Sequence, residues 1–407
     1  MTKMLGAIIG DIVGSRFEFE PTNDYHFELF SEDCSFTDDT IRSLLSALTP
    51  HPSPLTPLMA LKHYIFLLSL LAQVILFTQK AEAQTERLPI IRLNGEFGYE
   101  YSEGFIEIEN TDGTSTERLS VQVKWRGGST NTADKHKRNY AIKFPGNHVF
   151  FNMRSDDKWI LDAGQPDLFR LRNRVAMDLW NDFATKPYYS DMEPNAMSGV
   201  RGRVVEVYLN DRYIGIYNFS ERLDRKQMKL KKFDSDGTIH GLLWKSVGYG
   251  CATMGSVPEN YDNFSPVMDV FEAKYPELDD LDHTDYSILW NAINFVVNSS
   301  NDDFRNHVDE YFDLPVVIDY YLFVTVLGAL DNTGKNMYWA VYDCQKDKKI
   351  TPAIWDLDMT VGSYALEHIK TEFASPEYDL GYVIGLVSRL NQLNVDGFKE
   401  KVRKRYP

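Results

Sequence analysis

The sequence predicts an α+β fold in which a β-rich part precedes a largely helical part. In the first part, short runs of β-branched and aromatic residues are separated by turn signals such as Asn94-Gly95. Beyond residue 266 the pattern becomes helical, with apolar stretches at Ser287–Asn298 and Leu314–Leu330. A chain of 407 residues is long enough for one large domain or two ordinary ones, so a cleft between two parts is expected.

Each element of the β-rich part is predicted from its local pattern. Val204–Ser220 is expected to form a hairpin that turns at Asn210-Asp211. Asp167–Asp182 has helical periodicity, and its apolar positions are Leu171, Val175, Met177, Leu179 and Trp180. The remaining predicted strands are 90–93, 105–108, 119–125 and 140–144.

Composition excludes one class of partner. The formal net charge is −16, and so acidic a surface repels nucleic-acid backbones. Any site for a phosphate-bearing ligand must therefore gather its own positive charge from metal ions, Lys and Arg. The three cysteines, Cys34, Cys251 and Cys344, do not have metal-ligand spacing, and they are expected to be buried or idle thiols. A Cys251–Cys344 disulfide stays possible if the chain is exported.

The chain divides into four segments of unlike composition. Residues 1–48 have a polar, soluble character, and the proline-rich residues 49–58 are predicted to be a linker. Residues 59–84 resemble a signal peptide, and residues 85–407 carry the β-rich and helical patterns described above. This order indicates that two reading frames have been joined, either in nature or in the gene assignment.

The signal-peptide interpretation of residues 59–84 depends on three features in order. A start-like Met59 and a basic stretch precede the apolar run Tyr64–Phe77, and an Ala-x-Ala cleavage site ends at Ala83. The run is too short to span a bilayer comfortably. Export would give a secreted or cell-surface protein beginning at Gln84, with membrane contact only through residues 59–77 if cleavage fails. The alternative is a buried core helix.

The N-terminal segment carries a possible metal motif. Thr37, Asp38 and Asp39 offer adjacent oxygen ligands that suit Mg²⁺, although they would equally cap a helix beginning at Thr40. Together with the stretch Gly6–Glu18, this motif resembles the start of the ADP-ribosylglycohydrolase family, so residues 1–48 are expected to be a short helical fragment of that fold. The second Asp-rich cluster of that family is not visible in this sequence, and we expect the fragment to be catalytically dead.

A second motif lies near the C-terminus. An apolar helix is predicted to end at Leu330, and a polar loop, Asp331–Asn336, follows it. Two strands come next, and Asp356-Leu357-Asp358 ends the second one. Protein kinases have the same order of catalytic Asp, Asn five residues later, hairpin and metal-binding Asp. In such a site Asp331 would accept the proton of the attacking hydroxyl, while Asn336 and Asp356 would hold Mg²⁺. Taken alone, the residues are equally compatible with ordinary turns.

Residues 86–406 resemble the CotH family of kinase-like phosphotransferases. The resemblance is carried by motifs that occur in the order of the family: Lys124–Thr130, Lys137–Phe144, Trp159–Ala163, Leu171–Trp180, Tyr208–Glu221, Asp331–Asn336 and Ile354–Asp358. It implies an atypical protein-kinase-like fold of two lobes, a β-rich N-lobe and a helical C-lobe. It also implies use of ATP with Mg²⁺ or Mn²⁺, and phosphorylation of hydroxyls on proteins outside the cytoplasm.

The resemblance also suggests roles for single residues. Asp331 corresponds to the catalytic Asp, and Asp356 to the metal-binding Asp, with Asp358 as the second choice. Lys143 is a candidate for the nucleotide-binding lysine, although a surface position on a strand fits it nearly as well. Glu221 would pair with such a lysine or reach a metal, or would lie at a solvated strand end. The turn that begins at Arg126 and includes Ser129 is a candidate phosphate contact, since glycines between them let backbone N–H groups approach an anion.

Two departures from the kinase pattern bear on activity. Ala329-Leu330 replaces the His-Arg that precedes the catalytic Asp of conventional kinases, so the loop must be held in another way. The sequence ends at Pro407, inside what resembles the C-terminal helical region of the family, and some loss of stability is expected. An inactive pseudokinase or surface scaffold is therefore the alternative to an active enzyme.

Overall fold

The computed structural model describes residues 87–128, 131–132, 137–167, 169–361 and 383–405. Chain contacts group residues 86–407 into one unit, which is the unit described below. The predictions for residues 1–48, including Thr37, Asp38 and Asp39, and for the segments 49–58 and 59–84 fall outside the described residues, as does Ser129.

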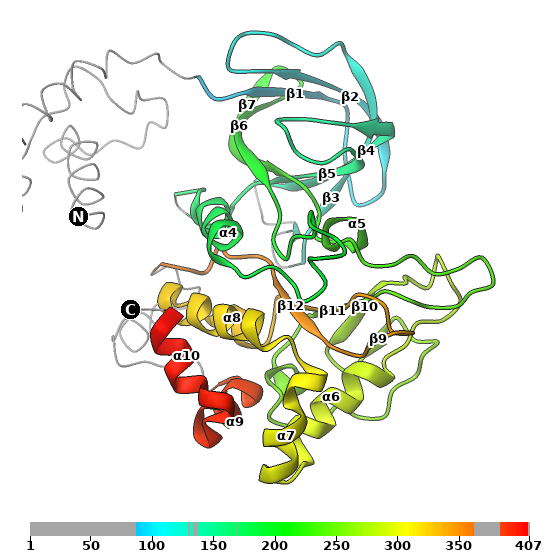
Figure 1. Cartoon of the computed structure of the whole chain (residues 1–407). Helices are drawn as coiled ribbons and strands as arrows, with labels where there is room; N and C mark the ends of the chain where they lie inside the picture. The colour runs from blue at the N-terminus through cyan, green and yellow to red at the C-terminus, as the bar shows by residue number, and fades with distance from the viewer. Residues whose placement is uncertain (1–86, 129–130, 133–136, 168, 362–382, 406–407) are drawn as a thin grey trace, which may run out of the picture. The chain divides into compact units, whose positions relative to one another are not determined.

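The β-rich part is a closed barrel of seven strands, in the order β1-β2-β3-β4-β5-β7-β6 (Figure 1). Neighbouring strands are antiparallel, except where β1 pairs with β6 in parallel and closes the barrel. The predicted strands and the hairpin are all present, and the hairpin turns at Asn210-Asp211. The bounds are β1 Ile90–Asn94, β2 Ser102–Glu109, β3 Leu119–Arg126, β4 Asn139–His148, β5 Asp156–Asp162, β6 Gly202–Leu209 and β7 Arg212–Ser220.

Alternating side chains fill the barrel. In β2 and β3, every second residue is buried, as the period of a strand requires. Trp159 of β5 stacks on Phe219 of β7, with ring centroids 5.1 Å apart. The interior is therefore a packed apolar core, and functional groups of the barrel must lie at its rim or outside.

The second part of the unit contains more strand than the sequence predicted. It has a five-stranded sheet in the order β12-β11-β8-β10-β9, with bounds β8 Leu242–Ser246, β9 Val267–Met268, β10 Phe271–Tyr275, β11 Met337–Val341 and β12 Thr351–Ile354. The expectation of a largely helical second part was thus only partly right. Strand β8 is short and mostly buried, and in β10 only the two end residues are buried, so neither shows the alternation that reveals a strand with one solvated face.

Helices accompany this sheet, and Figure 1 places α6 to α10 together in the lower part of the view. Helix α8 is buried around most of its circumference, and it ends three residues before the predicted end because Gly328 takes a left-handed conformation with φ 61°. The bounds are α4 Arg172–Phe183, α5 Arg225–Met228, α6 Ser287–Asn298, α7 Asn301–Tyr311, α8 Leu314–Leu327, α9 Gly385–Leu393 and α10 Phe398–Arg405. Within the described ranges, no helix is both long and apolar enough to cross a membrane.

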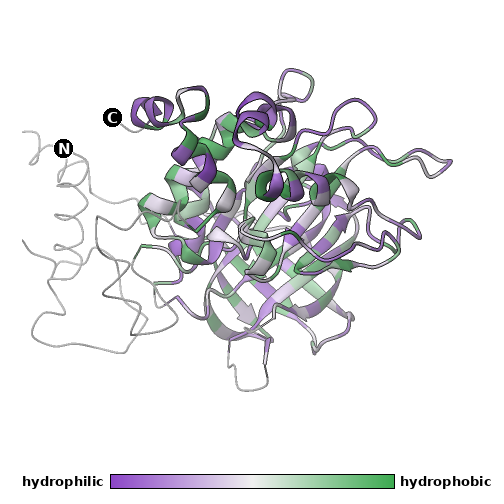
Figure 2. Cartoon of the chain, turned by 90° about the horizontal axis from the view of Figure 1, so that it is seen from below, coloured by the Kyte–Doolittle hydropathy of each residue, from purple (hydrophilic) through white to green (hydrophobic). Residues whose placement is uncertain are grey.

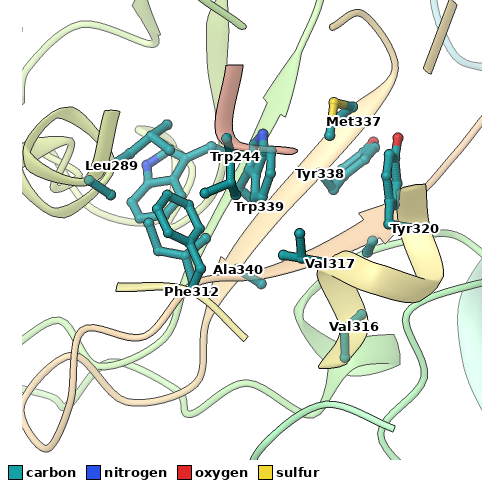
Figure 3. Packing of buried hydrophobic residues seen from close by; sticks show 14 of the residues in the cluster. Trp244, Leu289, Phe312, Val316, Val317, Tyr320, Met337, Tyr338, Trp339 and Ala340 are labelled. Carbon is teal, nitrogen blue, oxygen red and sulfur yellow. The ribbon is translucent and has the colours of Figure 1, made fainter. Parts of the chain in front are cut away.

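Large aromatic side chains join the sheet to the helices (Figure 3). Trp244 of β8 and Trp339 of β11 are direct cross-strand partners. Phe312 packs edge-on against Trp339, at a centroid distance of 6.2 Å. In Figure 2 the helices carry both hydrophobic and hydrophilic residues, as expected of helices that bury one side. This core supports the loops that follow α8 and β12.

Helix α4 buries a different stripe from the one predicted. Met177 and Trp180 are buried, but Val175 and Leu179 are 52% and 48% exposed. Residues 176, 177 and 180 face the core, and the Arg174 guanidinium lies with them because it pairs with Asp178, 2.6 Å away. The sequence pattern offered two apolar stripes, and periodicity alone did not choose between them.

Candidate functional site

The loop after α8 is held by buried side chains on three sides. Asn332 donates from its side chain to the carbonyl of Trp355 at 2.7 Å, and its own carbonyl accepts from the Tyr320 hydroxyl at 2.8 Å. On the sheet side, the carbonyl of Ser246 accepts from the backbone N–H of Asn336 at 3.0 Å, and the Ser246 hydroxyl bonds to Met337. These bonds hold a loop that lacks the His-Arg of conventional kinases.

Asp331 lies on this loop, and both of its carboxylate oxygens have partners. Oδ1 accepts a hydrogen bond from the Tyr249 hydroxyl at 2.5 Å, and Oδ2 lies 3.3 Å from Nζ of Lys335. The side chain is only 13% exposed, whereas that of Lys335 is 40% exposed. The carboxylate is therefore oriented and reachable by a hydroxyl group.

Asn336 and Asp356 share an unusual backbone conformation. Both have a positive φ of 59°. Asn and Asp tolerate this region better than other side-chain residues, and strained positions of this kind often occur at functional sites. Asp356 lies two residues after the end of strand β12, and the Leu357 N–H donates to the Asn173 side-chain oxygen at 3.0 Å.

Four carboxylates lie around one cavity of about 510 Å³. Asp162, Asp331, Asp356 and Asp358 all line it, as does Asn336. Burial, together with the negative charges of Asp356 and Asp162, raises the pKa of Asp358 to about 8. Burial also raises the pKa of Asp356, and the charge of Asp162 adds to this effect. Like charges that crowd in this way favour a cation among them.

Positive charge enters the same cavity from two strands. Arg126 is the last residue of β3, and Lys245 lies on β8. Burial lowers the pKa of both side chains, while Asp162 opposes this for Arg126 and Asp356 opposes it for Lys245. Gly127 and Gly128 also line the cavity, and Gly127 needs its freedom because its φ is 109°. The cavity therefore combines guanidinium and ammonium groups with carboxylates.

Two residues that were predicted to bind the nucleotide lie outside this cavity. Lys143 is exposed on the barrel strand β4, opposite Gln122 and Lys158, and does not line the cavity. Glu221 is buried and paired with Arg201 at 2.7 Å, and it also accepts from the backbone N–H of Arg154. Glu221 is therefore part of a polar network that includes Gln227 of α5.

The sequence patterns did not identify Lys245 and Asp162 as site residues. Lys245 follows three buried residues of a short strand, and Asp162 ends a strand that was not predicted. Both become candidates only when the fold brings them to Asp356. The "Trp-Ile-Leu-Asp" motif at 159–162 was the one signal available for Asp162.

A preformed metal centre is not present in the described part of the chain. No three His, Cys, Asp or Glu side chains of these residues are close enough together to hold an ion. The donors around the cavity are nevertheless all oxygens, namely Asp356, Asp358 and Asn336, and these suit Mg²⁺. Mg²⁺ is usually held by one or two carboxylates together with substrate phosphates and water, so the residues fit an ion that arrives with a nucleotide.

Comparisons with known proteins identify a family for this chain. A search of the curated proteins gives no match. A family model described as "CotH kinase protein" matches residues 123–406, a span that includes every described residue of the cavity. Because this match covers well over half of the sequence, the chain belongs to the CotH kinase family.

Proposed function

We propose that residues 86–407 form a kinase-like unit that transfers the γ-phosphate of ATP to hydroxyl groups of proteins. In this proposal the barrel is the β-rich lobe, and the second sheet with its helices is the other lobe. The observation that carries the proposal is the single cavity lined by Asp331, Asn336, Asp356, Arg126 and Lys245. Its volume of about 510 Å³ lies within the usual range for small-molecule sites.

In this mechanism Asp331 accepts the proton of the attacking hydroxyl. Lys335 holds the second oxygen of the Asp331 carboxylate, so the first oxygen is directed at the acceptor. Arg126 and Lys245 bind phosphate oxygens and stabilise the charge that develops during transfer. Rigid positioning is central to phosphoryl transfer, and the bonds of Asn332 and Ser246 provide it for the loop.

Asp356, Asp358 and Asn336 would hold Mg²⁺ or Mn²⁺. Such an ion neutralises phosphate charge during the transfer. The crowded carboxylates described above fit this role, because a cation would relieve their mutual repulsion. The proposed metal ligands thus follow helix α8 and strand β12, while Arg126 and Lys245 remain for the phosphates.

The acceptor and the location are further parts of the proposal. The CotH resemblance and the signal-peptide-like residues 59–84 support protein acceptors that are secreted or at the cell surface. The acidic composition argues against nucleic acid as a partner. Glycohydrolase activity from Thr37, Asp38 and Asp39 is not proposed, since only one of the two expected metal motifs occurs in the sequence.

The test is phosphate transfer by the purified 407-residue chain. The chain is incubated with ATP and Mg²⁺ or Mn²⁺, and a library of peptides containing Ser, Thr or Tyr is the acceptor. We expect labelled peptides, and we expect the label to disappear when a chelator removes the metal. Nucleotide binding without transfer to any hydroxyl, including those of the chain itself, would favour the pseudokinase alternative.

A further inference from the structure

Tyr249 places a hydroxyl group on the candidate catalytic carboxylate. Its hydroxyl donates to Oδ1 of Asp331 at 2.5 Å, on the oxygen that Lys335 leaves available. Tyr249 lies in the connection between β8 and the short 3-10 helix Gly250–Thr253, and its side chain is 40% exposed. The contact therefore joins the candidate base to a partly solvated segment outside its own loop.

The loop of Asp331 is shaped to receive this tyrosine. A Cβ atom added to Gly334 would lie 3.1 Å from Cδ1 of Tyr249 and 3.3 Å from its Cα. The ring thus packs directly on the bare backbone of the loop. Two glycines flank the tyrosine, and Gly250 has a φ of 41°, so the backbone at this point is one that glycine adopts easily.

The Tyr249 hydroxyl keeps its proton, so it would need a general base to react as a phosphoryl acceptor. Burial, and then the hydrogen bond to Asp331, raise the pKa of Tyr249 above its ordinary value. The hydroxyl is therefore neutral at physiological pH and gives up its proton only as its oxygen reacts. This is the relation between acceptor and base that general-base catalysis requires.

We propose that Tyr249 is a phosphoryl acceptor within its own chain. This proposal rests on the proposed function. The bond between the γ-phosphorus of a nucleoside triphosphate and its bridging oxygen breaks, and a bond forms between that phosphorus and Oη of Tyr249. The Tyr249 proton passes to Asp331, and the nucleoside diphosphate leaves. Tyr249 is the acceptor in this proposal because its hydroxyl already donates to the Asp331 carboxylate.

Phosphorylation would open the site to other acceptors. The new phosphate carries a charge of about −1.5 to −2 and repels the neighbouring Asp331 carboxylate. Gly248 and Gly250 allow the segment to turn away, so the oxygen that Tyr249 occupied becomes free. The unmodified chain should therefore phosphorylate external peptides after a lag, and Tyr249→Phe, which has no hydroxyl to remove, should show no lag.

The test is peptide mapping of the full chain after incubation with ATP and Mn²⁺. Tyr249→Phe keeps the ring on Gly334, and Tyr261→Phe is the matched control because Tyr261 is 39% exposed. We expect phosphate on the Tyr249 peptide in the parent and in Tyr261→Phe, its complete loss in Tyr249→Phe, and a decrease of about 10²–10⁴-fold in Asp331→Asn. The initial rate per chain should not depend on protein concentration.

The outcomes separate this inference from the proposed function. Phosphate on external peptides or on other residues of the chain, with none on Tyr249, would overturn the inference and leave the proposed function intact. Phosphate on Tyr249 that persists in Asp331→Asn, or whose rate rises with protein concentration, would also overturn it. Absence of transfer to every hydroxyl, in the chain and in added peptides, would overturn both.

Discussion

The barrel and the second sheet contribute differently to the candidate site. Both are built around a large apolar core, but the barrel interior is filled by alternating side chains such as Ile106 and Val121. The second sheet instead positions the loops that carry Asp331 and Asp356. The barrel lines the cavity mainly with residues at or near the ends of its strands, among them Arg126, the last residue of β3, and Asp162, the last residue of β5. The barrel interior is therefore structural, and the candidate site lies where strands end.

Two lysines illustrate the difference. Lys143 and Lys245 both lie on strands with a cross-strand partner, yet Lys143 is exposed on the outside of the barrel. Lys245 is partly buried and faces the charge of Asp356, and burial lowers its pKa. Under the proposed function, Lys245 is placed to contact phosphate because its strand borders the carboxylate loops, whereas Lys143 is not.

The largest effect is expected at Asp331. Asp331→Asn should keep the fold and nucleotide binding but lower turnover by about 10²–10⁴-fold, since the amide cannot accept the proton of the acceptor. Turnover is measured as phosphate transfer under saturating ATP. Asp282→Asn is the control, because the Asp282 side chain is 86% exposed. Parental turnover in Asp331→Asn would reduce Asp331 to a turn residue and strengthen the pseudokinase alternative.

Substitution of Asp356 should weaken metal-dependent nucleotide binding. Asp356→Asn is the better variant, because alanine at a φ of 59° would add backbone strain of roughly 1–2 kcal/mol, whereas asparagine tolerates this conformation. Loss of a metal carboxylate should weaken Mg-ATP binding by several kcal/mol. Calorimetry with and without Mg²⁺ measures the effect. Equal Mg-ATP affinity in parent and variant would remove Asp356 from the metal site.

The candidate site was predictable from the sequence where it is local. Asp331, Asn336 and Asp356 lie within one helix–loop–hairpin segment, so their order alone placed them together, and they line one cavity. Lys245 comes from a strand that joins β11 only by a long-range pairing, and no local pattern marks it. The Lys143 prediction followed a motif of the barrel, and the fold directs that residue to solvent.

The same limit applies to the fold. The α+β class and most strands of the barrel follow from alternation and turn residues. Closure depends on the parallel pairing of β1 with β6, in which Ile91 lies opposite Val207, far away in sequence. Strand β8 lacks alternation because it is buried on both faces, and β10 lacks it because its three central residues are all partly exposed. Local patterns therefore predict elements, and non-local contacts decide how they assemble.

The comparison of the two lysines can be tested directly. Lys245→Met should weaken ATP binding about tenfold, a loss of about 1.4 kcal/mol, whereas Lys143→Met should leave it unchanged. Methionine keeps the length and apolar contacts of each side chain, so the pair isolates the charge. Affinity is measured by titration with ATP and Mg²⁺. A loss at Lys143 with none at Lys245 would place the nucleotide against the barrel wall and reverse the comparison.

The smallest effect concerns the end of the second sheet where β8 begins and β11 ends. There His240 bonds to Asp343 at 2.8 Å and to Asp234 at 3.0 Å. The bond to Asp343, followed by that to Asp234, raises the pKa of His240 above its ordinary value of 6.5. Because the folded pKa is raised, the stabilisation is fully present below pH about 6.5 and is lost as pH rises through the folded pKa. The lowered pKa of Asp343 matters only in more acidic solution.

His240→Gln should therefore cost less than about 1 kcal/mol, because the ion pairs are partly solvated. The difference in the free energy of unfolding between parent and variant should be largest near pH about 5.5 and should shrink toward pH about 8.5. Denaturant unfolding across this range measures it. A difference that stays constant with pH would show that His240 holds the ends of β8 and β11 as a neutral ring. In that case the ends of β8 and β11 would be held by side-chain packing and hydrogen bonding and not by charge.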